Sequence, residues 1–158
     1  MTKITVLASM LIWGSILPNL KADECSNADL RGVYSFVAAG TILPSSGLPA
    51  GLLGPFAAAG RTIYDGNGSA SGVIELSLNG TIIPSPVPPN PPSPPSTWTA
   101  TYTVDPSTCT ATKAITITSG PLKGVVLNFF ISAGADFKEL RFIATNPGTA
   151  ISGTARKQ

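Results

Sequence analysis

Apolar and polar residues alternate along most of this chain, which is the pattern of β-strands with one buried face. The segment 97–104 is the clearest example, because threonines occupy one face and the other carries Trp98, Ala100, Tyr102 and Val104. Short runs rich in Gly, Asn, Asp and Pro separate the alternating segments and favour turns. The predicted strands are 32–40, 55–64, 69–78, 81–83, 97–104, 110–119, 125–133, 137–145 and 150–156.

Sequential strands joined by short turns favour an all-β fold, an up-and-down antiparallel meander. We expect it to close into a barrel of about eight strands by pairing the first strand with the last, which removes exposed edges. A β-sandwich is the alternative that the same pattern allows. Segment 84–96 holds eight of the fifteen prolines and cannot join a sheet interior, so it is expected to be an exposed loop.

Turn lengths determine which face of each strand points inward. Two-residue loops at 134–135 and 147–148 would set Leu127 opposite Phe142 and Phe142 opposite Gly153, giving one apolar face across three strands.

A two-residue loop at 66–67 would set Ile74 beside Ala59. Because Arg61 shares a face with Ala59, this register turns Arg61 toward the interior. A buried arginine needs a partner, since an unpaired buried charge is costly. A ligand carboxylate or a solvated place at the barrel mouth would provide one. A bulge or a slip of one residue would instead put Arg61 on the surface.

The first residues have the layout of a secretory signal peptide. A basic start is followed by the apolar run 4–17, a break at Pro18 and a small residue, Ala22, at the expected cut. The apolar run is too short for a stable membrane-spanning helix, although an uncleaved anchor is the alternative. We therefore expect 1–22 to be removed, leaving a single domain, 23–158, that is secreted to the extracellular space or the periplasm.

Two cysteines in a secreted chain predict one disulfide, between Cys25 and Cys109, that fastens the N-terminal arm to the barrel. Two free reactive thiols are the alternative. Removal of Lys3 and Lys21 with the signal leaves equal numbers of basic and acidic residues. A neutral chain offers no electrostatic basis for binding nucleic acid, and after signal cleavage no segment is apolar for long enough to cross a membrane.

The inventory of reactive side chains excludes most catalytic mechanisms. The chain has no histidine, so the commonest general base and metal ligand is missing. Most carboxylates fall in turns or in the N-terminal arm, and phosphate-binding loops are absent, so no catalytic residue, metal or cofactor is expected. An interior pocket, or plain core packing, would account for the aromatic residues Tyr34, Phe36, Trp98 and Tyr102.

The chain resembles a family of small, uncharacterised, secreted bacterial proteins. The segments that carry the resemblance are CSNADLRGVY from Cys25, GPFAAAGR from Gly54, YDGNG from Tyr64, TYTVDP from Thr101 with Cys109-Thr110, ELRFI from Glu139, and PGT at 147–149 through GTARKQ from Gly153. The resemblance implies a barrel similar to those of allene oxide cyclases and lipocalins, and with it an apolar ligand. It assigns no catalytic residue.

Three functions fit these observations. The first is a secreted barrel that binds a small apolar ligand through Arg61, Tyr34, Phe36, Trp98 and Tyr102. The second is a structural or surface protein with a filled barrel, whose protein contact is the Pro-rich loop 84–96. The third is a cyclase-like or isomerase-like enzyme acting on an apolar substrate, for which Arg61 is the residue to test.

Overall fold

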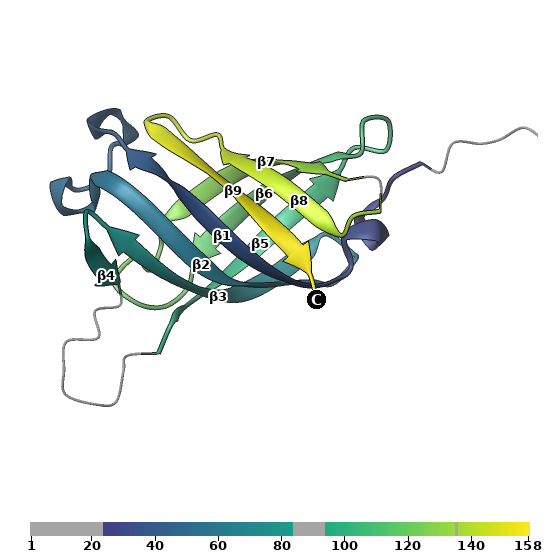
Figure 1. The fold of residues 1–158 in the computed structure, drawn as a ribbon, viewed down its shortest axis with the longest axis horizontal. Helices are drawn as coiled ribbons and strands as arrows, with labels where there is room; N and C mark the ends of the chain where they lie inside the picture. The colour runs from purple at the N-terminus through teal and green to yellow at the C-terminus, as the bar shows by residue number, and fades with distance from the viewer. Residues whose placement is uncertain (1–23, 84–93, 135) are drawn as a thin grey trace, which may run out of the picture.

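The computed structural model describes residues 24–83, 94–134 and 136–158 (Figure 1). The predicted signal peptide and residues 84–93 of the Pro-rich segment lie outside these ranges, so both stay predictions. The nine strands of the described chain are β1 (Gly32–Ile42), β2 (Gly54–Tyr64), β3 (Ser69–Leu78), β4 (Thr81–Ile83), β5 (Ser96–Val104), β6 (Thr110–Ile117), β7 (Val126–Ala133), β8 (Glu139–Ala144) and β9 (Thr149–Lys157). The 3₁₀ turns are η1 (Asn27–Leu30), η2 (Pro44–Ser46) and η3 (Ala50–Leu52).

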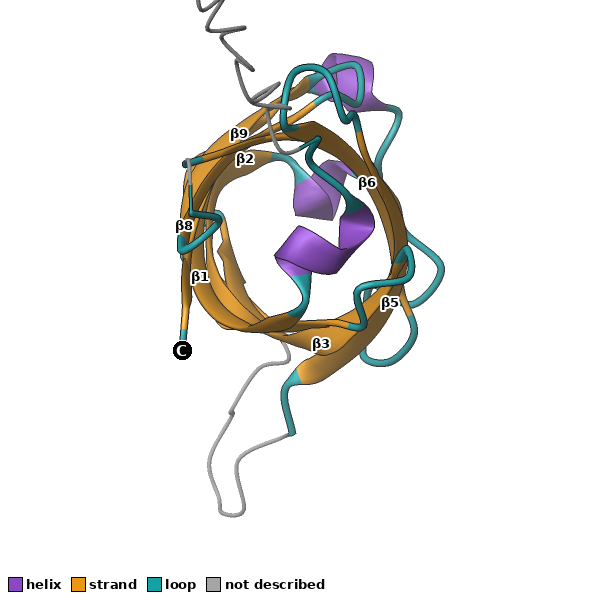
Figure 2. Cartoon of the chain, turned by 90° about the vertical axis from the view of Figure 1, so that its right-hand side faces the viewer, coloured by secondary structure: helices purple, strands orange, loops and turns teal. Residues whose placement is uncertain are grey.

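Eight of these strands form a closed antiparallel barrel, as predicted. Each pairs with its neighbours in the sequence, β3 pairs with β5 across the short β4, and β1 pairs with both β2 and β9. β4 is an extra strand that pairs with β3 alone. The sandwich alternative is therefore wrong, and Figure 2 shows the ring of strands seen along the barrel.

Apolar residues at every second position of the strands fill the interior. Trp98 and Tyr34 are its largest fully buried side chains. Glycines on neighbouring strands give the aromatic rings room, because a Cβ added to Gly72 would come within 2.5 Å of the Trp98 ring. At Gly60 an added Cβ would lie 2.7 Å from the Phe36 ring. These rings therefore lie flat against the inner surface of the sheet.

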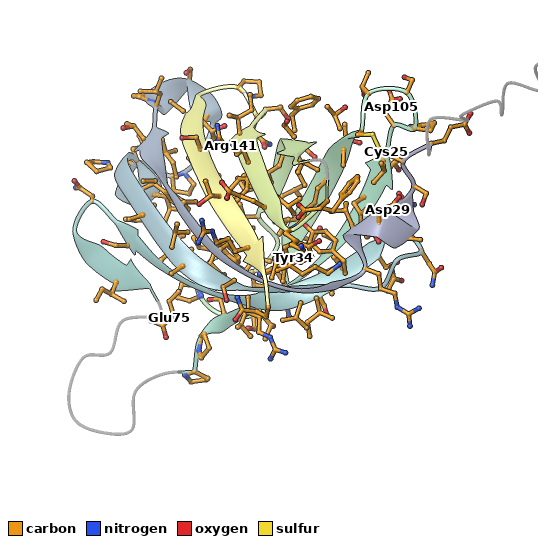
Figure 3. The ribbon with its side chains drawn as sticks, turned by 45° about the vertical axis from the view of Figure 1, so that its right-hand side comes forward. Cys25, Asp29, Tyr34, Glu75, Asp105 and Arg141 are labelled. Atoms are coloured by element: carbon orange, nitrogen blue, oxygen red, sulfur yellow. A yellow bond between two sulfur atoms is a disulfide. The ribbon has the colours of Figure 1, made fainter. Side chains whose placement is uncertain are left out.

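Both ends of the barrel are covered. At one end η1 places Leu30, which is fully buried, over the opening, and the Asn27 side chain accepts a hydrogen bond from the Val104 amide at 2.8 Å. The predicted disulfide between Cys25 and Cys109 is present at this end (Figure 3). At the other end the segment 43–53, which carries η2 and η3, packs Leu48, Leu52 and Leu53 against the core. Figure 2 shows helical turns within the ring of strands.

The predicted register of β2 against β3 is wrong by one residue. Ala59 pairs with Glu75, whereas Ile74 pairs with Gly60. The cause is the turn: the Asp65 carboxylate accepts hydrogen bonds from the amides of Asn67 at 2.7 Å and Ser69 at 2.9 Å, which builds a three-residue loop with positive φ angles at its two glycines. A slip of one residue exchanges the two faces of a strand. The slip turns Arg61 and the other residues on its face of β2 outward. It turns Tyr64 and the residues on the opposite face inward.

The connection between β7 and β8 is also longer than predicted. Phe142 pairs with Ile131 instead of Leu127. A shift of four residues keeps every side chain on its predicted face, because the period of a strand is two. The pairing of Phe142 with Gly153 is confirmed. The apolar face across β7, β8 and β9 is therefore present despite the longer loop.

Candidate functional site

Among the described residues, one cationic side chain points into the barrel. Lys113 lies in β6, whose inward positions are Ala111, Lys113, Ile115 and Ile117. Ala111, Ile115 and Ile117 pack toward the interior, and Lys113 points inward because it lies on the same face of the strand. Only 8% of its surface is exposed.

The Lys113 ammonium lies in an aromatic pocket. Its Nζ donates a hydrogen bond to the hydroxyl of Tyr64, at 3.1 Å. It also lies 4.9 Å from the centroid of the Tyr64 ring and 4.5 Å from that of Trp98. Cation–π contacts of this kind stabilise a charge that has lost water, but less than a carboxylate would.

No carboxylate compensates this charge within the described chain. The acidic side chains of the described residues lie on the outside of the barrel or in turns, and none lines the cavity around Lys113. Burial therefore lowers the pKa of Lys113 from 10.5 to about 7, so that near neutral pH a large share of the amine carries no proton.

The pKa values of the buried tyrosines around Lys113 shift in the opposite direction, upward. Burial raises the pKa of Tyr64 well above its ordinary value and that of Tyr34 to about 12. Their rings and that of Tyr102 form an edge-to-face series, with centroids 5.3 Å apart for Tyr34 and Tyr64 and 5.0 Å apart for Tyr64 and Tyr102. Tyr64 therefore stays protonated beside the amine at neutral pH.

Lys113 and Tyr64 face a small apolar cavity. Its volume is about 50 Å³, measured as the space open to the centres of water molecules. On this measure one water needs about 10–15 Å³, so the cavity has room for a small organic group. Among its lining residues the polar groups are Thr62, Tyr64, Lys113 and the indole of Trp98, and the remaining lining is Ala, Ile, Leu and Phe.

One polar atom of the cavity-lining residues lacks a hydrogen-bond partner. The buried Trp98 Nε1 has no hydrogen-bond acceptor among the described residues. Buried polar atoms are satisfied in most proteins, so an unpaired donor at a cavity is an observation that points to a ligand or a water. Trp98 thus contributes both a ring against the lysine and a free donor.

The structure brings four of the five predicted ligand-binding residues inside the barrel. Phe36 and Trp98 line the cavity. Tyr34 and Tyr102 are buried, but their hydroxyls are engaged: Tyr34 donates to the Phe137 carbonyl at 2.8 Å, and Tyr102 accepts from the Gly66 amide at 2.9 Å.

Arg61, the fifth predicted residue, is exposed on the outer face of β2. Of the two positions that the sequence allowed for Arg61, the structure has the one on the surface, because the register of β2 against β3 slips by one residue. Arg61 therefore does not line the interior site. The enzymatic alternative loses the residue nominated to test it.

Sequence reasoning missed the two central polar residues, Lys113 and Tyr64. Alternation in β6 already places Lys113 on the face of Ala111 and Ile115, so the signal was present in the sequence. Tyr64 was missed because the wrong turn length put it on the outer face.

Residues 24–83, 94–134 and 136–158 contain no group of three or more His, Cys, Asp or Glu side chains placed to bind a metal. Within the same ranges no helix has the length and hydrophobicity to span a bilayer.

Comparison with known proteins gives no relative. The chain matches no protein-family model, no curated protein sequence and no solved structure. What the chain itself defines is a closed eight-stranded antiparallel barrel with a disulfide at one end and a lysine–tyrosine pair in its interior.

Proposed function

We propose that this protein is a secreted barrel that binds a small apolar molecule in its interior cavity, with Lys113 and Tyr64 holding a polar oxygen of that molecule. The observation that carries the proposal is an amine without a carboxylate partner inside an apolar cavity. Small eight-stranded barrels such as the lipocalins can hold one small ligand in their interior. The disulfide supports secretion, since such bridges persist in oxidising compartments.

The cost of burying Lys113 supports a role in binding. A buried charge without an opposite charge destabilises a fold, and replacement by an apolar residue of similar volume is often neutral or stabilising. A barrel selected for stability alone would gain from methionine at this position. A ligand oxygen that accepts a hydrogen bond from Lys113 would give a binding role to an amine that otherwise only destabilises the fold.

A filled, structural barrel is the second candidate, and the small size of the cavity favours it. Large side chains such as Trp98 and Tyr34 already occupy most of the lumen. Eight-stranded barrels can be filled by their own side chains. The two candidates differ in whether an added apolar molecule enters.

The test is native mass spectrometry on the secreted, oxidised protein with 1-hexanol as the probe. Ala58 lines the cavity and its neighbour Ala57 is exposed on the outer face, so Ala58→Leu and Ala57→Leu form a matched pair. Retention of one hexanol by the wild type and Ala57→Leu, with at least a tenfold weaker signal for Ala58→Leu, would support interior binding. Absence of hexanol from all three proteins, or equal retention by both variants, would refute it and favour the filled barrel.

A further inference from the structure

The polar end of the cavity is equipped for more than hydrogen bonding. Lys113 Nζ and the Tyr64 hydroxyl lie 3.1 Å apart, so one small group can contact both atoms. Among the described residues the Tyr64 hydroxyl hydrogen has no acceptor, and it is free to donate to such a group. A nucleophilic amine next to a weak acid is the arrangement that carbonyl addition needs.

We propose that Lys113 captures small apolar aldehydes covalently, as an imine, with Tyr64 as the proton donor and acceptor. This inference rests on the proposed function, because the aldehyde must first occupy the cavity. Phe36, Phe129 and Phe142 would pack against its hydrocarbon part. Since no carboxylate lines the cavity, no fixed negative charge holds the amine in its protonated form.

The reaction balances without any further reagent. The lone pair of the neutral Nζ forms a bond to the carbonyl carbon, and the carbonyl π electrons move to the oxygen, which takes a proton from Tyr64. Nζ returns a proton to the Tyr64 oxygen, giving the carbinolamine. Nζ then expels the hydroxyl group, which leaves as water with a proton from Tyr64, and loses its last proton to Tyr64. Overall, aldehyde and amine give imine and water, with no oxidation or reduction.

The ionisation of the site supports this chemistry. With its pKa at about 7, Lys113 is about half neutral at pH 7. A surface lysine with a pKa of about 10.4 is neutral to less than one part in a thousand. The groups that face Lys113 are the rings of Tyr64 and Trp98, and Tyr34 and Tyr102 pack around Tyr64. The charged groups at the edge of this cluster are Lys157, whose Nζ lies 5.7 Å from the centroid of the Tyr34 ring, and Asp65, whose carboxylate lies 3.5 Å from the Tyr102 hydroxyl.

The experiment treats the oxidised protein with hexanal and sodium cyanoborohydride, which reduces the imine to a stable hexyl-lysine. Peptide mapping then gives the modification rate of each lysine and of the chain's amino terminus. The exposed Lys123 and Lys138 are internal controls. We expect Lys113 to be modified at least tenfold faster than either at pH 7, and its rate to rise between pH 6 and pH 8. We expect Tyr64→Phe, which keeps the ring, to slow the modification of Lys113 about tenfold.

A modification rate at Lys113 no higher than at Lys123, or one that Tyr64→Phe leaves unchanged, would overturn the proposal. Hexanol binding by the Ala57→Leu and Ala58→Leu pair separates this failure from failure of the proposed function. If the wild type and Ala57→Leu retain 1-hexanol, Ala58→Leu does not, and Lys113 does not react, the cavity binds apolar molecules and only the imine is wrong. If the wild type retains no hexanol and Lys113 does not react, both proposals fail.

Discussion

Replacement of Lys113 by methionine should change how the stability of this protein depends on pH. The pKa of Lys113 is 10.5 in the unfolded chain and about 7 in the folded barrel. The unfolded chain therefore binds a proton that the folded protein lacks throughout this interval. Stability must rise with pH wherever the unfolded state binds more protons. This part of the stability is present at alkaline pH and is lost as the pH falls toward 7.

The size of the effect follows from the two pKa values. Each pH unit between them corresponds to about 1.4 kcal/mol, so below the folded pKa the full penalty for the buried ammonium is about 5 kcal/mol. Between pH 7 and pH 10 the free energy of unfolding should rise by about 3–4 kcal/mol from this group alone. Above pH 10 the raised pKa values of Tyr34 and Tyr64 act in the opposite direction, because the unfolded chain then loses tyrosine protons first.

The assay is urea unfolding of the wild type and Lys113→Met at pH 7 and pH 10, without ligand. Lys113→Met should be more stable relative to wild type at pH 7 than at pH 10, and this difference in the free energy of unfolding should shrink by about 3–4 kcal/mol. Comparing two variants at each pH cancels the titration of every other group. Lys123→Met, at an exposed turn lysine, is the control and should show no such change. A Lys113→Met difference that stays constant within about 1 kcal/mol would refute a buried, unpaired amine.

Three further predictions concern the frame of the site. Reduction of the Cys25–Cys109 bridge, which spans 84 positions, should lower the free energy of unfolding by about 4–5 kcal/mol in the chain-entropy model, measured by urea unfolding with and without reductant. Gly72→Ala should cost about 1–3 kcal/mol in the same assay, because the new Cβ meets the Arg61 carbonyl oxygen and the Trp98 ring. Gly51→Ala should cost less, because nothing lies within 4 Å of its added Cβ. Asn27→Ala should speed amide exchange at Val104 severalfold in hydrogen-exchange mass spectrometry, because that amide loses its acceptor.

The sequence was sufficient for the barrel because period-two alternation and turn residues determine it locally. The Asn79-Gly80 turn pairs Leu78 with Thr81, as a two-residue loop requires, and both turn residues have positive φ. Closure could also be predicted from the pattern. An open meander has one exposed edge on its first strand and one on its last, and pairing these two strands removes both edges. Even the wrong loop length between β7 and β8 did no harm, because an even shift preserves the faces.

The site could be predicted less fully than the barrel, because it depends on a register shift of one residue between β2 and β3, and a shift by an odd number exchanges the faces of a strand. Gly66 and Gly68 suit several turn types, and the choice between these types depends on the hydrogen bonds that the Asp65 carboxylate accepts from the backbone amides of Asn67 and Ser69. That single choice moved Arg61 outward and Tyr64 inward. Lys113 needed no such information, and a search for charged residues on apolar faces would have found it. The lack of a carboxylate near Lys113, however, depends on the inward-facing residues of all eight barrel strands, which one strand's pattern does not show.

The disulfide and the buried lysine are linked through stability. Burial of the Lys113 ammonium costs about 5 kcal/mol at or below neutral pH, which is comparable to the about 4–5 kcal/mol that the Cys25–Cys109 bridge contributes. Native domains are stable by only about 5–15 kcal/mol, so the barrel would tolerate such a cost poorly without an offset of similar size. The bridge acts on the unfolded chain and leaves the interior unchanged. It therefore allows the cavity to keep an amine that a purely structural core would replace, and the protein should be least stable when it is both reduced and acidic.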